Sequence, residues 1–277
     1  MADKPALQHI PYAGKSALAI STARSGIFAR GRKDAADAAA AAADAAAELH
    51  YRQGARYYSG NGEAKDLGKA ATSFRKAAEL GHAEAQYRVA MMYGDGIGVE
   101  KNFVEAAVWD RRAAEQGHPY AQANLSYRYY AGEGLPQDFA EAFGWCRRAA
   151  EKELAWAQCN LGMMYRKGEG VAQNLVEATL WYRKAAEQGW ADAQYELGAL
   201  YYNGYGTAAD PGEAALWYRK AADQGHAEAQ FQLGYLYGTG QGVPHDYVQA
   251  RYWGRKAAEQ GHEQAQQDLK KREYRDA

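Results

Sequence analysis

Small and hydrophobic residues recur along most of this chain at a constant spacing of 36 residues. In residues 83–118, Val89 and Tyr93 mark one face of a helix, which the glycine-rich stretch 94–98 ends. Ala106 and Trp109 then mark the buried face of a second helix. The pattern predicts a helical hairpin rather than strands.

The same unit occurs six times without insertion or deletion, over residues 47–82, 83–118, 119–154, 155–190, 191–226 and 227–262. One column holds only tyrosine: Tyr57, Tyr93, Tyr129, Tyr165, Tyr201 and Tyr237. Each tyrosine precedes a Gly-x-Gly pair, which we expect to adopt positive φ angles. A further column of helix-capping residues holds Asp66, Asn102, Asp138, Asn174, Asp210 and Asp246.

One helical hairpin cannot bury its own apolar faces, so the units must stack on one another. We therefore predict an all-α fold: a right-handed α/α superhelical solenoid of six 36-residue helix-turn-helix repeats plus helical caps. Residues 34–46 are rich in alanine and predict an N-terminal helix cap, and residues 263–277 predict a C-terminal capping helix.

Residues 1–33 lack the repeat pattern and carry a net charge of +5. Gly, Ser and Pro interrupt this segment, so we predict a basic, disordered extension, with room for a short helix over 15–28. It is a passive tail, an arm that docks on an acidic partner, or a targeting segment.

Composition narrows the class of protein. The 277 residues have a net charge of −1, whereas a general nucleic-acid binder is strongly basic. Cys146 and Cys159 are too few for a disulfide scaffold, and no apolar run approaches the roughly 20 residues of a membrane helix. We expect a cytoplasmic protein that neither binds nucleic acid nor inserts into a membrane.

The repeat is similar to the Sel-1-like repeat family, a branch of the tetratricopeptide-like solenoids. The resemblance covers residues 47–262 and is clearest over 229–243, which read AQFQLGYLYGTGQGV, followed by Asp246, Ala250, Trp253 and the stretch 256–262. It implies a scaffold or adaptor for protein complexes and signalling, with a partner that differs between members.

Some positions depart from the repeat. Glu153 and Leu154 stand where the other units have glycine and mostly histidine, and Trp156 stands where most have an acidic residue. In the first unit, Gln53 replaces the motif leucine and Ser73 the tryptophan.

No catalytic or metal-binding arrangement is evident. His82, His118, His226 and His262 each lie at a repeat junction, too far apart to converge on one metal ion, and we expect them near the negative end of a helix. No nucleophile has a neighbouring base, so we predict no enzyme activity and no cofactor. A remote alternative comes from cysteine-rich relatives, which the resemblance links with weak beta-lactam hydrolysis.

The first helices of such solenoids line the concave surface, where binding residues vary while packing residues do not. Positions one before and two after the motif leucine should face this groove, and the third and fourth units add aromatic residues that could equally be packing residues. The candidate partner-binding residues are Arg52, Arg88, Met91, Asn124, Tyr127, Tyr130, Trp156, Asn160, Met163, Glu196, Gln232 and Tyr235.

Charge along these helices is graded. Basic residues occupy the first four units (Arg52, Arg88, Arg128, Arg166 and Lys167), and Asp192 and Glu196 the fifth. This favours a protein or peptide partner with an acidic segment and an apolar middle. The sequence thus predicts a non-catalytic scaffold that binds a partner in its concave groove; the alternative is a structural protein that self-assembles through its tail or ends.

Overall fold

The computed structural model describes the backbone of residues 16–276 and the side chains of residue 33 and residues 36–269. This part of the chain contains helices and no strand. The helices are α1 (Ser16–Ser59), α2 (Leu67–Glu79), α3 (Ala83–Asp95), α4 (Phe103–Glu115), α5 (Pro119–Ala131), α6 (Phe139–Ala150), α7 (Ala155–Lys167), α8 (Leu175–Glu187), α9 (Ala191–Asn203), α10 (Pro211–Asp223), α11 (Ala227–Thr239), α12 (Tyr247–Glu259) and α13 (Glu263–Asp276).

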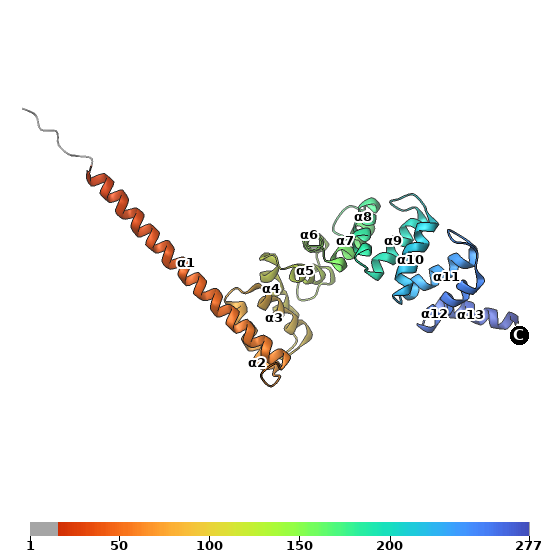
Figure 1. Ribbon diagram of the computed structural model, residues 1–277, viewed down its shortest axis with the longest axis horizontal. Coiled ribbons are helices and arrows are strands. Elements are labelled where there is room, and N and C mark those ends of the chain that lie inside the picture. Colours follow the sequence, from red (N-terminus) through yellow and green to blue (C-terminus); the bar gives the residue numbers. More distant parts are fainter. Residues whose placement is uncertain (1–15, 277) are drawn as a thin grey trace, which may run out of the picture.

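Each helix packs against the helix before it and the helix after it, and the hairpins follow one another along an extended array (Figure 1). The apolar core is accordingly a row of clusters, one after another along the array, built from buried alanines with Leu, Met, Trp and Tyr. The predicted all-α solenoid is confirmed. The hand of the superhelix stays a prediction.

Helix α1 is much longer than the other helices and extends away from the repeats (Figure 1). It runs through the alanine-rich stretch 34–46 into the first repeat without a break. The predicted disorder of residues 1–33 stays a prediction: residues 1–15 lie outside the described part, and the structure includes 16–33 in α1.

Asparagine and aspartate begin the second helix of every repeat, as the sequence predicted. Asn102 shows the arrangement: its Oδ1 accepts hydrogen bonds from the backbone N–H groups of Val104 and Glu105, at 3.0 and 3.1 Å. The glycine pairs also adopt positive φ angles, as expected. The second glycine has a further role, because a Cβ on Gly134 would clash with the carbonyl of Phe103 in the preceding repeat.

The junction histidines serve two helix ends. His118 lies at the negative end of α4, as expected, where its backbone N–H donates to the Ala113 carbonyl at 3.1 Å. Its side chain also caps the positive end of α5, which the sequence did not predict, because its Nδ1 accepts from Ala121 N–H at 3.2 Å. Its Nε2 lies 2.9 Å from Glu84 Oε2, so the ring carries its proton on Nε2 and links two repeats. His82, His226 and His262 repeat this arrangement.

A glutamine ladder joins most of the repeats; it starts after the first junction, where the two positions are His50 and Leu80, and it is interrupted between α6 and α7. Gln86, Gln158, Gln194 and Gln230 each accept a hydrogen bond from a glutamine 30 residues later. The partner expected for Gln122 is Lys152, and the buried Oε1 of Gln122 has no partner. The next residue, Glu153, adopts a φ of 63°, a conformation that the other junctions give to glycine. The α6–α7 junction is therefore the least regular of the array.

Candidate functional site

A hollow of about 300 Å³ lies on the first helices of the second, third and fourth repeats. Met91 on α3, Asn124 and Tyr127 on α5, and Trp156 on α7 line it, which brings together four of the twelve candidate residues from three repeats. Tyr127 is the most accessible of the four, with 52% of its surface exposed. Of the patch that the sequence singled out around the third and fourth units, Asn124, Tyr127 and Trp156 line this hollow, whereas Tyr130 and Asn160 do not.

The hollow exists because Gly94 lies in it. The equivalent position holds Tyr58, Tyr130, Arg166 and Tyr202 in four other repeats, and a side chain of that size would fill the space. Gly238 is the only other glycine of this column, and it lines a second hollow. A glycine in a repeat column of large side chains indicates a hollow, and this signal is present in the sequence.

The floor of the hollow is a buried ion pair that joins α4 to α5. Arg128 Nε lies 2.7 Å from Asp110 Oδ2, and Asn124 Nδ2 lies 3.4 Å from Asp110 Oδ1. Asp110 is fully buried and Arg128 is 6% exposed. Burial raises the pKa of Asp110 from 3.8 to about 6, an effect that outweighs the opposing influence of Arg128.

Apolar pairs occupy the same two columns in the next three repeats: Cys146 with Met164, Tyr182 with Leu200, and Tyr218 with Leu236. A buried ion pair is a weak contributor to stability, because removing two charges from water offsets their attraction. The pair at the floor of the hollow is thus a departure that folding does not require.

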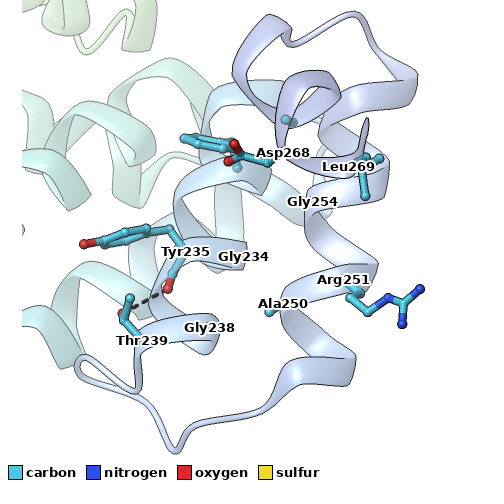
Figure 2. A pocket seen from close by; sticks show the side chains of 11 residues that line it. Gly234, Tyr235, Gly238, Thr239, Ala250, Arg251, Gly254, Asp268 and Leu269 are labelled. Atoms are coloured by element: carbon cyan, nitrogen blue, oxygen red, sulfur yellow. Dashed lines mark hydrogen bonds between the residues drawn. The ribbon is translucent and has the colours of Figure 1, made fainter. Parts of the chain in front are cut away.

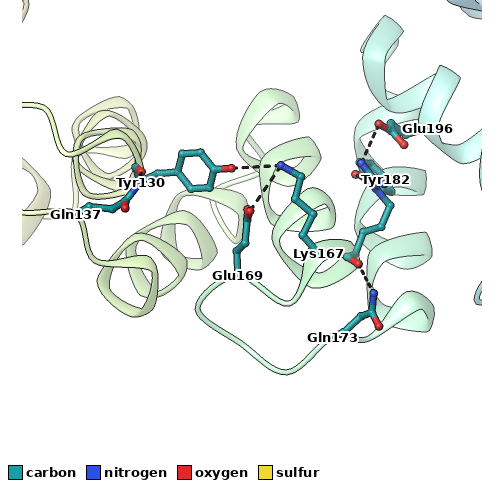
Figure 3. Close-up of polar contacts among 8 residues, drawn as sticks. Tyr130, Gln137, Lys167, Glu169, Gln173, Tyr182 and Glu196 are labelled. Atoms are coloured by element: carbon teal, nitrogen blue, oxygen red, sulfur yellow. Dashed lines mark hydrogen bonds and ion pairs between the residues drawn. The ribbon is translucent and has the colours of Figure 1, made fainter.

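The basic residues of the predicted charge gradient form ion pairs within the chain. Arg52 pairs with Glu48 and Arg88 with Glu84, within one helix in each case. Arg128 is bound to Asp110. In the fourth repeat Arg166 reaches Glu196 at 3.5 Å, and Lys167 lies 3.7 Å from Glu169 and 3.4 Å from the hydroxyl of Tyr130 (Figure 3). Each basic residue of the gradient therefore has an acidic partner within the chain.

The remaining candidate residues are accessible but separate from the hollow. Tyr130 packs edge-on against Phe139 as well as binding Lys167, and Met163 packs between two core clusters. Asn160 is half-buried. Burial raises the pKa of Glu196 although Arg166 opposes this, and Gln232 donates to Glu228 at 3.2 Å.

Tyr235 belongs to the second hollow, of about 290 Å³, between α11, α12 and α13 (Figure 2). The second hollow results from the residues at two repeat columns. Tyr218 packs against Gly198 in the fifth repeat, so that a Cβ on the glycine would lie 2.8 Å from the ring. In the sixth repeat both positions are glycine, Gly234 and Gly254, and both line the hollow because neither has a side chain to fill it.

The sequence interpretation missed a surface on the second helices. Val108, Leu180, Leu216 and Tyr252 belong to one repeat column and are exposed, Leu216 by 59%. Their common register was the signal, since an apolar residue at a constant exposed position forms a stripe. This stripe is an alternative to the first helices as a surface for binding a partner.

Groups that would suggest other chemistry are arranged as packing residues. Cys146 and Cys159 are free and buried, and burial raises the pKa of both thiols to about 12. Among the residues whose side chains are described, no three His, Cys, Asp or Glu side chains are grouped so as to hold a metal ion. Over the same part of the chain, no helix has an apolar stretch of the length that crossing a membrane requires.

Comparison with known proteins places the chain in a family. The profile of the Sel1 repeat matches residues 46–82, 83–118, 119–154, 157–190, 191–226 and 227–262. Among curated proteins, none matches the chain. The matches agree closely with the six units and show that the chain belongs to the Sel1 repeat family, whose members are generally protein-interaction scaffolds.

Two solved structures of the same kind are similar. The first is c5321, a protective antigen of uropathogenic Escherichia coli strains with an SLR fold, which is 40% identical with a TM-score of 0.76. That match covers 79% of this chain and 47% of c5321, so the chain spans about half of that protein's length. The second, a Sel1 repeat protein from Oxalobacter formigenes, is 35% identical with a TM-score of 0.70, over 78% of this chain and 84% of that one.

Proposed function

We propose that this protein is a non-catalytic scaffold that binds a partner polypeptide on its first helices, at the hollow formed by α3, α5 and α7. The single observation that supports this role is the lining of the hollow. Exposed Tyr127 and half-buried Trp156 and Met91 surround the polar Asn124 and Arg128. Large accessible aromatic and thioether side chains around a few fixed polar groups are typical of sites that anchor a partner.

The arrangement suits a segment that lies across several repeats. The lining residues come from three successive first helices, so an occupant contacts α3, α5 and α7 together. An extended peptide has that reach, and its backbone supplies polar groups at regular intervals for Asn124 and Arg128.

Affinity capture from a lysate of the source organism tests the proposal with two matched double variants. N124A/Y127A removes side chains from the hollow, and L180A/L216A removes two exposed side chains from the stripe on the second helices. We expect a protein that the native chain and L180A/L216A both retain to be lost with N124A/Y127A, while far-ultraviolet circular dichroism stays unchanged. Equal capture by N124A/Y127A would refute the assignment to the first helices.

A further inference from the structure

The floor of the hollow contains hydrogen-bond donors that the protein itself does not use. The Nε of Arg128 donates a hydrogen bond to Asp110, and neither Nη nitrogen has a hydrogen-bond partner among the described residues. A Cβ on residue 94 would lie 3.1 Å from Nη2, so these donors point to the place that Gly94 leaves open. More than nine-tenths of the Arg128 side chain is buried, which fixes its position, and the Nη donors at the hollow can bind an acceptor that an occupant supplies.

The rim of the same hollow has unpaired negative charge. Asp95 and Glu133 both line it, and neither forms an ion pair with a described residue. Glu169, the equivalent of Glu133 one repeat later, has Lys167 at 3.7 Å instead. Asp110 neutralises Arg128 at the floor, and Lys101, which lies over the Phe103 ring, offsets one of the two rim carboxylates, so the net charge of the site is negative.

The walls are aromatic, and some of them already attract cations. Lys101 Nζ lies 4.6 Å from the centre of the Phe103 ring, and the Arg88 guanidinium carbon lies 5.9 Å from the centre of the Tyr87 ring. Tyr127 and Trp156 have no cation of the chain over their rings among the described residues. An aromatic face beside a carboxylate is a favourable environment for a Lys or Arg side chain.

We propose that this hollow binds a basic segment of the partner, which deepens the proposed function and rests on it. A backbone carbonyl of the segment accepts hydrogen bonds from Arg128 at the floor. A Lys or Arg side chain lies along Tyr127 and Trp156 and reaches the carboxylates of Asp95 and Glu133. The charge complementarity is therefore opposite to the acidic partner that the sequence alone favoured.

Three matched peptides test the inference on the full chain. They are acetyl-Gly-Leu-X-Leu-Gly-amide with X as Arg, Gln or Glu, and the readout is the ¹³C-methyl NMR signal of methionine. Met91 lines the hollow, whereas Met164 is buried in the fourth repeat and serves as the internal reference. We expect the Arg peptide to shift the Met91 signal, the Gln peptide to bind about fivefold more weakly, and the Glu peptide to bind weakest.

Two single variants separate the rim charge from a general charge effect. E133Q should lower the affinity for the Arg peptide by about fivefold and leave that for the Gln peptide unchanged, whereas E169Q should change neither. The double variant D110C/R128M, which copies the apolar pair of the next repeat, should weaken binding of both the Arg and the Gln peptide by at least about tenfold.

Tighter binding of the Glu peptide, an equal effect of E133Q and E169Q, or no shift of Met91 with any peptide overturns the basic-segment inference. These outcomes are distinct from failure of the proposed function. Equal binding of all three peptides would also overturn the basic-segment inference, because the hollow would then bind polypeptide without selecting charge. The capture experiment tests the scaffold role separately.

Discussion

Replacing the buried pair of Asp110 and Arg128 by the apolar pair of the next repeat, D110C/R128M, gives the most informative test of folding energetics. R128M alone leaves a fully buried carboxylate without its 2.7 Å partner, and should cost about 3–5 kcal/mol of unfolding free energy. D110C alone leaves the guanidinium unpaired and should cost a similar amount. The double variant should be as stable as the native chain or up to about 3 kcal/mol more stable, because both desolvation penalties disappear.

The pKa of Asp110 determines how the difference in stability between the native chain and D110C/R128M depends on pH. Burial raises the pKa from 3.8 to about 6, so the folded chain holds the proton more strongly than the unfolded chain between these values. The contribution of Asp110 to stability is therefore fully present below about pH 4 and is lost as the pH rises through about 6. At about 1.4 kcal/mol for each pH unit, the native chain should lose about 3 kcal/mol over this window relative to D110C/R128M.

Urea-induced unfolding, followed by far-ultraviolet circular dichroism, measures all four proteins at about pH 4.5 and about pH 7. We expect a double-mutant coupling energy of at least about 3 kcal/mol at the higher pH and a smaller one at the lower pH. The reasoning fails if each single variant costs less than about 1 kcal/mol, or if the double variant is as unstable as the sum of the two.

Three further predictions concern the irregular positions of the repeat. E153G should stabilise the chain by about 0.5–1 kcal/mol in urea unfolding, since relief of the left-handed conformation exceeds the added freedom of the unfolded chain, and the reverse change G189E in the next junction should destabilise it. K152Q should add about 1 kcal/mol by giving the buried Oε1 of Gln122 the partner that other junctions have, and loss of stability in the same assay would contradict this. G254Y should fill the C-terminal hollow and raise the unfolding free energy by about 1–2 kcal/mol, because no atom lies within 4 Å of a Cβ at that position; an aggregated or less stable variant would show that the hollow is not open to a ring.

The repeat columns were sufficient to predict the architecture. Their Asn and Asp residues predicted the caps of the second helices, and their glycine pairs predicted the turns with positive φ angles. These features are local, so the residue type and its neighbours determine them. For His118 only one of two roles was predicted: its backbone lies at the negative end of α4, and only the structure shows that its Nδ1 also meets the N-terminus of α5.

The candidate site was predicted in part. Met91, Asn124, Tyr127 and Trp156 share one surface in the structure, as a regular stack of first helices requires. The partners of the basic residues were not predictable in the same way, because the pairing of Arg128 with Asp110 depends on how two different helices pack. Asp110 is the only acidic residue of its column, and Arg128 shares its own column with one other arginine, Arg56, so this acidic departure 18 residues before an arginine was the available signal.

Site-specific photocrosslinking tests the central claim most directly, that a partner polypeptide binds the first helices at the hollow. p-Benzoyl-phenylalanine replaces Tyr127 in one protein and Leu216 in the other, two side chains that are 52% and 59% exposed on different faces of a repeat. The account predicts a covalent adduct with a partner protein from position 127 and none with that partner from position 216. An adduct from position 216 without one from position 127 would contradict it.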